Sequence, residues 1–213
     1  KAEEVRLAAL SVSPLSEGRR QALRGIELLD TPMLTRSTAF TYLERTELGL
    51  HGLLPPHVES SLEQVARAYE AYQQKTHDLE RHIYLRALQD RNEVLFYTLL
   101  LDHIEEMIPI IYTPVVAQAC RQFSHIYRRP RGLFVSYPLR DSIPALLNNR
   151  PHRDVDVMVV TDGQRVLGIG DQGAGGLAIS IAKLSLYTLI GGILPTRTLP
   201  VLLDVGTNNP RLL

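Results

Sequence analysis

The spacing of apolar residues is that of helices over roughly the first 149 positions. The clearest repeat has the three-, four- and seven-residue spacings of one helix face, formed by Leu62, Val65, Ala66, Tyr69 and Tyr72. Ser60 or Ser61 is the expected N-cap of this helix. Gln64 and Arg67 lie three positions apart on its polar side, which the pattern alone predicts to be solvated.

Two further helices are expected over Asp78–Gln89 and from Asn92 to Met107, the second ended by Pro109. Arg91 lies at their junction, where a charged side chain commonly caps a helix or faces water. Tyr112 comes just before a helix started by Pro114, with Thr113 as the expected cap. Its hydroxyl can point into a cleft, or the ring can lie half in the core as an amphipathic residue.

Short apolar and β-branched runs indicate strands after the arginine cluster, at Gly132–Ser136, Val155–Val160, Arg165–Ile169 and Pro200–Val205. A glycine-containing turn predicts that the second and third form a hairpin. An apolar helix between the last two predicts a parallel βαβ unit. The fold class is therefore α/β, with a helical amino-terminal domain over residues 1–130 and the start of a parallel-sheet α/β domain over residues 131–213.

The helix expected over Leu177–Ile190 is apolar or small on every face, which predicts burial all round. Lys183 lies in its middle. Desolvating an ammonium group is costly, and burial favours the neutral amine, which is the form that a general base needs. Alternatively, Lys183 reaches water along its methylene stem.

The loop before this helix, Gly168-Ile-Gly-Asp-Gln-Gly173, has the letters G-x-G-x-x-G of a dinucleotide site. Asp171, however, would place a carboxylate among the N–H groups that bind a pyrophosphate. The ribose-binding acid expected about 20 positions further on is also missing, since the next acidic residue is Asp204. The loop is better explained as a wall for a small anionic substrate, with Arg165 and Lys183 supplying positive charge.

The composition argues against several classes of protein. Acidic and basic residues balance at 23 each, and the short cluster Arg128-Arg129-Pro130-Arg131 lacks interleaved aromatics, so no nucleic-acid partner is expected. Cys120 is the only cysteine, which excludes an intrachain disulfide and fits a reducing, cytoplasmic location. The histidines show no metal-ligand spacing. Polar residues and a glycine pair interrupt the apolar run 177–194, so no membrane span is expected.

Ordered motifs from about residue 25 onward resemble the amino-terminal part of malic enzymes, especially the long bacterial, NAD-preferring kind, which is similar to the mitochondrial form. The motifs are Gly52-Leu-Leu-Pro-Pro, Gln89-Asp-Arg-Asn-Glu, Pro109-Ile-Ile-Tyr-Thr-Pro, Arg129-Pro-Arg-Gly-Leu-Phe, Val160-Thr-Asp-Gly-Gln-Arg-Val-Leu-Gly-Ile-Gly-Asp-Gln-Gly and Leu203-Asp-Val-Gly-Thr-Asn-Asn. The resemblance implies oxidative decarboxylation of L-malate to pyruvate and CO2, with NAD or NADP and Mg²⁺ or Mn²⁺.

The resemblance also implies roles for individual residues. Tyr112 would be the general acid that protonates the enolpyruvate carbon, Lys183 the base that takes the malate hydroxyl proton, and Arg165 the clamp on a malate carboxylate. Positions that bind the activator fumarate in the mitochondrial form match Gln64, Arg67 and Arg91. The family usually has Gly-Ile-Pro-Ile-Gly-Lys before the lysine, whereas this chain has Ala178-Ile-Ser180-Ile-Ala182-Lys183.

In that family the metal-binding carboxylates and the dinucleotide domain lie beyond the point that corresponds to Leu213. We therefore expect no metal or cofactor residue in this segment, and no turnover of malate by the segment alone. The start at Lys1 and the stop just after a strand-like run also suggest a part of a longer chain. A homodimer or homotetramer is expected. Two alternatives stay open: a malolactic enzyme that forms lactate, and a non-catalytic dicarboxylate-binding and oligomerisation module.

Overall fold

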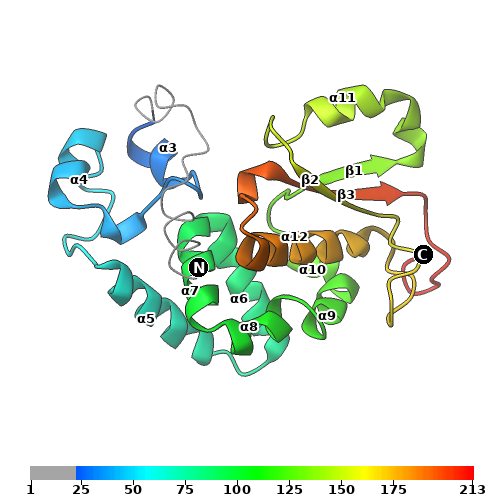
Figure 1. The fold of residues 1–213 in the computed structure, drawn as a ribbon, viewed down its shortest axis with the longest axis horizontal. Coiled ribbons are helices and arrows are strands. Elements are labelled where there is room, and N and C mark those ends of the chain that lie inside the picture. The colour runs from blue at the N-terminus through cyan, green and yellow to red at the C-terminus, as the bar shows by residue number, and fades with distance from the viewer. Residues whose placement is uncertain (1–22) are drawn as a thin grey trace. The chain divides into compact units, whose positions relative to one another are not determined.

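The computed structural model describes residues 23–213, which fall into two compact units. The first runs to Ile104, and the second covers Glu105–Leu213 (Figure 1). Each unit is described by itself. The structure confirms the α/β class, because helices precede a small parallel sheet. The division into domains at residue 130 stays a prediction.

The first unit is helical. Its elements are α3 (Gly25–Leu29), the 3-10 turn η1 (Ser37–Ala39), α4 (Tyr42–Leu48), α5 (Ser61–Gln73), α6 (Asp78–Arg91) and α7 (Glu93–Asp102). Ser60 caps α5 as predicted: its hydroxyl accepts from the Glu63 N–H at 3.2 Å, and the Glu63 carboxylate accepts from the Ser60 N–H at 2.7 Å. Asn92 caps α7 by accepting from the Leu95 N–H.

The buried face of α5 differs from the predicted one. Its buried residues are Gln64, Val65, Ala68 and Tyr72. Leu62 was predicted to be in the core but is 69% exposed, and Gln64 was predicted to be solvated but is 5% exposed. The Gln64 amide is tolerated in the core because it donates to the Arg36 carbonyl oxygen at 3.0 Å and the Thr38 hydroxyl at 2.9 Å. The prediction was wrong because hydropathy ranks an amide as polar whether or not its hydrogen bonds are satisfied.

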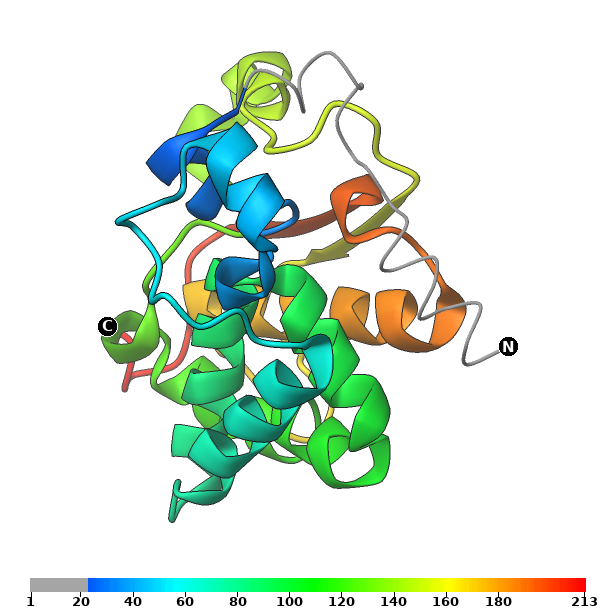
Figure 2. The ribbon, with the colours of Figure 1, turned by 90° about the vertical axis from the view of Figure 1, so that its left-hand side faces the viewer.

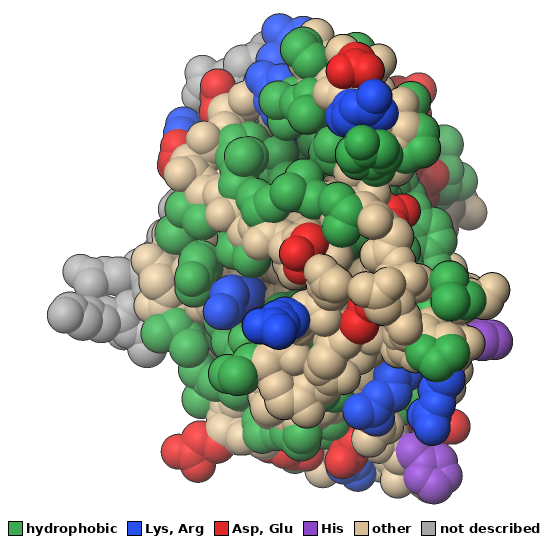
Figure 3. All heavy atoms as spheres, turned by 90° about the vertical axis from the view of Figure 1, so that its right-hand side faces the viewer, with side chains coloured by type: hydrophobic (Ala, Val, Ile, Leu, Met, Phe, Trp, Pro, Cys, Tyr) green, Lys and Arg blue, Asp and Glu red, His purple; other side chains and the backbone are tan. Residues whose placement is uncertain are grey.

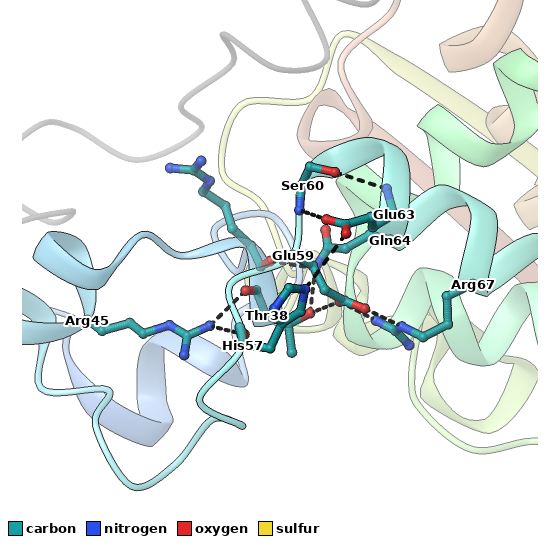
Figure 4. Close-up of polar contacts among 9 residues, drawn as sticks. Thr38, Arg45, His57, Glu59, Ser60, Glu63, Gln64 and Arg67 are labelled. Atoms are coloured by element: carbon teal, nitrogen blue, oxygen red, sulfur yellow. Dashed lines mark hydrogen bonds and ion pairs between the residues drawn. The ribbon is translucent and has the colours of Figure 1, made fainter.

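Arg45 is a buried cation enclosed by main-chain oxygens (Figure 4). Its guanidinium donates at 2.7–3.3 Å to the carbonyl oxygens of Thr38, Phe40, Pro55, Pro56 and His57. Burying a charge is tolerated when its polar hydrogens are all satisfied in this way. The Gly52-Leu-Leu-Pro-Pro segment and the residues after it are thereby folded against the start of α4.

Glu59 connects the segment held by Arg45 to α5. Its carboxylate accepts from Nε of Arg67 at 2.7 Å and from Nη2 at 2.8 Å, and it also accepts from the Thr38 hydroxyl (Figure 4). The Arg67 hydrogen bonds are the main reason that the pKa of Glu59 falls to about 2. The Glu59 side chain is only 14% exposed, so water screens this bidentate pair less than an ordinary surface pair.

The second unit is built around a three-stranded sheet. Its helices and 3-10 turns are α8 (Ile104–Ile111), α9 (Val115–Arg121), α10 (Phe123–Ile126), η2 (Tyr137–Ser142), α11 (Ile143–Asn148), η3 (Gly173–Gly176), α12 (Leu177–Gly191) and η4 (Pro195–Arg197). The strands β1 (Leu133–Ser136), β2 (Val157–Thr161) and β3 (Thr198–Asp204) have the order β1-β3-β2 and are all parallel. Thus β2, α12 and β3 form a parallel βαβ unit. The prediction had its helix and its second strand right, but took Arg165–Ile169 instead of β2 as the first strand.

Helices cover both faces of this sheet, as parallel sheets require. On one face, α11 places Leu146 and Leu147 against a core formed by Leu133, Val135, Leu199 and Val201. On the other face, α12 packs along β2 and β3 (Figures 1 and 2). In Figure 2 the orange helix α12 lies along the sheet.

The predicted hairpin partner of β2 is not a strand. Residues Arg165–Ile169 form turns closed by a single antiparallel bridge between Val166 and Gly170. Positive φ values at Gly168 (+80°) and Gly170 (+76°) turn the chain too tightly for an extended run. The prediction was wrong because it read three apolar residues as a strand and ignored the glycines among them.

Two predictions about helix ends were also wrong. The break falls at His103, and α8 then continues through Pro109 to Ile111. Thr113 does not cap α9: the N-cap is Pro114, which has no side-chain hydrogen bond. The main-chain oxygen of Tyr112 instead accepts from the Val116 N–H at 2.7 Å.

Glycines let two segments approach the amino end of α12. A Cβ atom at Gly175 would lie 2.4 Å from the carbonyl oxygen of Cys120 in α9, and one at Gly176 would lie 2.7 Å from Cα of Gly163 after β2. No side chain fits at such distances. These contacts join α9, β2 and α12 into one packed group.

We predict that Gly175→Ala destabilises the protein by about 1–3 kcal/mol, because the added methyl forces the α9 carbonyl and η3 apart. Gly175 does not have a positive φ, so the contact alone is responsible. Gly191→Ala is the matched control: a Cβ there meets nothing within 4 Å, and alanine should stabilise the helix end by about 0.5–1 kcal/mol. Urea unfolding measures both. Equal effects of the two substitutions would refute the close-packing argument.

We also predict that Glu59→Gln makes the free energy of unfolding less dependent on pH in the acidic range. The pKa of Glu59 is depressed from 4.5 to about 2, so its stabilising contribution is complete above pH 4.5 and is lost as the pH falls toward 2. The variant should lose on the order of 1–2 kcal/mol at pH 7, since Arg67 is more than half exposed and the pair is partly screened. That difference should shrink between pH 5 and pH 3 in urea unfolding. Glu70→Gln, which changes an exposed residue of α5, the helix that carries Arg67, should have little effect on the free energy of unfolding at any pH.

Candidate functional site

Lys183 lies on the less covered side of α12. The lysine is partly exposed rather than fully buried, and Tyr187 and Ile190 on the same side are 40% and 65% exposed. The prediction of burial all round was therefore wrong. The prediction failed because the sheet covers only one side of α12, although the helix is apolar on every side. The ammonium group of Lys183 makes no hydrogen bond or ion pair with another residue of the described range 23–213.

The helix that carries Lys183 is unbroken from Leu177 to Gly191. Ser180 stands where the family motif usually has proline, and its buried hydroxyl finds no hydrogen-bond partner among the described residues. By length and composition alone the run Gly173–Gly191 could cross a membrane, with a mean hydropathy of 1.4. Its packing on β2 and β3 instead identifies it as a core helix.

Tyr112 is half-buried at the carboxyl end of α8, where the chain turns into α9. Its N–H donates to the Ile108 carbonyl oxygen at 2.9 Å, which fixes the main chain at this corner. Because α9 packs on α12 through the Gly175 contact, Tyr112 and Lys183 come from neighbouring helices. The Tyr112 hydroxyl makes no hydrogen bond within the described residues.

Arg165 lies in the turn between β2 and the glycine-rich loop and is exposed. Within residues 23–213 its guanidinium has neither a hydrogen bond nor an ion pair. The structure therefore brings Tyr112, Arg165 and Lys183 into one compact unit, on elements that meet around α12, with their polar groups uncommitted. No hydrogen bond joins any two of the three side chains within this range.

Asp171 accepts hydrogen bonds from one amide of the glycine-rich loop and from one amide of the tail after β3. Its Oδ1 accepts from the Gly173 N–H at 2.9 Å, and its Oδ2 accepts from the Asn208 N–H at 2.8 Å. Burial opposes ionisation of this carboxyl, but the main-chain N–H groups outweigh it, and the pKa of Asp171 is lowered from 3.8. A carboxylate that already holds these donors does not fit the pyrophosphate of a dinucleotide.

The face that carries this loop and the chain end is shown in Figure 3. Main-chain and uncharged polar atoms, drawn in tan, form much of its centre, with acidic and basic side chains interspersed. Within residues 23–213 no group of three or more histidine, cysteine, aspartate or glutamate residues could hold a metal ion. Burial raises the pKa of Cys120 to about 12, which leaves its thiol unreactive.

Gln64 and Arg67 are brought together through two residues that the sequence did not single out. The Gln64 amide donates to the Thr38 hydroxyl, and that hydroxyl donates to the Glu59 carboxylate. The same carboxylate accepts from the Arg67 guanidinium (Figure 4). The eight-residue gap between Glu59 and Arg67 crosses a loop, so no helical spacing could reveal the pair.

Arg91 stands apart from that network and donates from Nε to the Ala87 carbonyl oxygen at 3.2 Å. Tyr84 connects Arg91 and Arg67 electrostatically. Burial raises the pKa of the Tyr84 hydroxyl, while the charges of Arg91 and Arg67 both act to lower it. The two arginines therefore approach Tyr84 closely enough for their charges to matter, although they share no hydrogen bond with each other.

Comparison with known proteins identifies the family of the chain. The model of the malic enzyme N-terminal domain matches residues 89–213. Proteins named NAD-dependent malic enzyme are similar along most of the chain. The one from Vibrio parahaemolyticus is 58% identical over 189 residues, which is 89% of this chain and 34% of that protein. The one from Pectobacterium carotovorum is 59% identical over 186 residues, or 87% of this chain and 33% of that protein.

The chain thus spans about a third of the length of these relatives. The family model covers more than half of the chain, and its matched range contains Tyr112, Arg165 and Lys183. The motifs, the parallel βαβ unit and the matches agree with one another. The chain belongs to the malic enzyme family.

Proposed function

We propose that this chain supplies the substrate side of the active site of an NAD-dependent malic enzyme, which converts L-malate to pyruvate and CO2. The observation that carries the proposal is the presence of three uncommitted polar side chains in one compact unit. Tyr112 lies before α9, Arg165 in the turn after β2 and Lys183 on α12 itself. None of the three has the polar group of its side chain hydrogen-bonded or ion-paired to another described residue. Functional polar groups are kept free in this way when a ligand is to engage them.

Each of the three residues has a part in that chemistry. Arg165 binds a malate carboxylate with its planar guanidinium, which matches two carboxylate oxygens. Lys183, as the free amine, takes the proton of the malate C2 hydroxyl when that carbon is oxidised. After the carboxylate next to C3 leaves as CO2, Tyr112 gives the proton of its hydroxyl to C3 of the enolpyruvate. The partial exposure of Lys183 suits this part, because a base must meet its substrate.

We assign no residue between 23 and 213 to the cofactors of the proposed reaction. NAD is the acceptor that the names of the relatives indicate. The glycine-rich loop does not fit it, because the Asp171 carboxylate lies within the loop and already accepts from the Gly173 N–H. The divalent ion of the family has no ligand cluster within residues 23–213. We therefore assign no step to either group here.

We further propose that the enzyme is a cytoplasmic homodimer or homotetramer. The single, buried Cys120 suits a reducing compartment. Malolactic conversion, in which the product is lactate, would use the same three residues, so product analysis must separate the two reactions. The non-catalytic dicarboxylate-binding module is the less favoured alternative, because it leaves the free groups of Tyr112 and Lys183 without a purpose.

We predict that Lys183→Met in the full-length enzyme lowers kcat for malate oxidation by at least about 100-fold, since general-base catalysis contributes roughly 10²–10⁴-fold. Lys75→Met is the matched control: Lys75 lies in the first unit, near the ring of Tyr84, and its loss should leave kcat within about twofold. NADH absorbance and pyruvate release measure the rate. An unchanged kcat would exclude Lys183 as the base, and lactate as the product would favour the malolactic reaction.

We propose that fumarate, if it regulates this enzyme, binds Arg67 through the edge of the guanidinium that Glu59 leaves open. Glu59 uses Nε and one hydrogen of Nη2, so the Nη1 edge still has donors for a carboxylate. Gln64 contributes only indirectly, because its amide hydrogens are bonded to Arg36 and Thr38. Arg91, whose charge also acts on the Tyr84 hydroxyl, is the candidate for the second carboxylate.

We predict that fumarate binding, measured by titration calorimetry on the full-length enzyme, is lost in Arg67→Ala and weakened in Arg91→Ala. A single arginine–carboxylate contact of this kind contributes about 1.5–3 kcal/mol, or roughly 10- to 100-fold in Kd. Arg153→Ala, an exposed arginine of the second unit, serves as the control for general charge loss. Unchanged fumarate heat in Arg67→Ala, or no heat with the unaltered enzyme, would remove the effector site.

A further inference from the structure

We infer that Asp171 is a positioning residue that ties two segments of the chain into a single wall of the substrate site. The segments are the glycine-rich loop, residues 168–176, and the tail after β3, residues 205–211. This inference rests on the proposed function for its effect on malate. The tie itself is a property of the fold and can be tested without turnover.

The two carboxylate oxygens of Asp171 serve different segments. Oδ1 accepts from the N–H of Gly173 in the glycine-rich loop at 2.9 Å, and Oδ2 accepts from the N–H of Asn208 in the tail at 2.8 Å. The main-chain oxygen of Asp171 accepts from Nδ2 of Asn209 at 2.9 Å. The Thr207 side chain bonds the carboxylate as well. A residue with one acceptor atom could not hold both main-chain donors.

Every hydrogen bond between the described parts of these two segments ends on Asp171. The other hydrogen bonds of the tail are internal, from Gly206 to Asp204, from Asn209 to Thr207 and from Leu212 to Asn209. Beyond these bonds the segments meet through apolar contact, since a Cβ at Gly173 would lie 3.3 Å from Leu212 and 3.5 Å from Thr207. The tail is therefore held in register by one residue, through Oδ2 of its side chain and through its main-chain oxygen.

The glycine-rich loop has a separate anchor on its other side. The Gln172 N–H donates to the Gly163 carbonyl oxygen at 2.8 Å, and Gly163 and Gly173 pack main chain against main chain. Loss of the Asp171 carboxylate should therefore release the tail and leave α12 in place. Lys183 would keep its position on α12, while the wall beside the turn of Arg165 would loosen.

This separation predicts which kinetic constant changes. A base that stays in place preserves the chemical step, whereas a loosened wall weakens the holding of the substrate. Asp171→Asn in the full-length enzyme should therefore raise KM for malate at least tenfold and leave kcat within about threefold. Hydrogen exchange should become at least tenfold faster for the amides of residues 205–211, but not for those of α12.

Asp162→Asn is the matched control. Asp162 is an exposed aspartate nine positions earlier whose carboxylate accepts only from the N–H of Gln164, within its own turn. It should leave both the exchange of residues 205–211 and KM unchanged. A general loss of stability would speed exchange in α12 and lower kcat as well, so the pattern of the two readouts distinguishes positioning from damage.

The possible outcomes all decide the inference. Faster exchange confined to the tail, together with a raised KM, supports it. Unchanged exchange at Asn208 and its neighbours in Asp171→Asn refutes the tie. Faster tail exchange with unchanged KM refutes the role in substrate binding. If the unaltered enzyme does not oxidise malate, the proposed function fails, and the exchange comparison of Asp171→Asn with Asp162→Asn still decides whether the tie exists.

Discussion

The close approach of main-chain segments at the amino end of α12 is the constraint on which the proposed site depends. Gly175 meets the last turn of α9, and Gly176 meets Gly163 at the end of β2. Each contact is possible only because hydrogen replaces a side chain. Through the first contact Tyr112, which precedes α9, is placed relative to Lys183 on α12, and through the second the turn that carries Arg165 is fixed to the same helix. Three residues distant in sequence therefore share one rigid support.

The two units treat their polar groups in opposite ways. In the first unit Arg45 is surrounded by main-chain oxygens, and Glu59, Thr38 and Gln64 satisfy one another. Such closed networks fix structure and leave little free for a ligand. In the second unit the charged groups of Arg165 and Lys183 make no hydrogen bond or ion pair with another described residue. Both side chains reach solvent, which leaves them accessible to the substrate that we propose.

The sequence allowed prediction wherever a single segment determines its own structure. The Ser60 cap, α6 and the strands β1, β2 and β3 followed from local pattern and turn residues, whereas the first strand of the βαβ unit was wrongly expected at Arg165–Ile169. The prediction failed where partners come from elsewhere in the chain. Gln64 is buried because Arg36 and Thr38 receive its hydrogen bonds, and Lys183 is partly exposed because the sheet covers only one side of its helix. Glu59 could not be found as the partner of Arg67, because it lies before the N-cap of α5, where helical spacing no longer applies.

The glycine-rich loop shows why a motif must be judged by the destinations of its hydrogen bonds. Gly168 and Gly170 have positive φ and open space around them, so they turn the chain without bringing it against any neighbour. Gly173, the third glycine, packs on the tail after β3 instead of on a helix that receives a phosphate. The negative charge that a dinucleotide would bring is already supplied by Asp171. The same letters that elsewhere hold a ligand here hold another segment of the protein, and the two residues that we propose for substrate binding and proton transfer, Arg165 and Lys183, lie on either side of that loop.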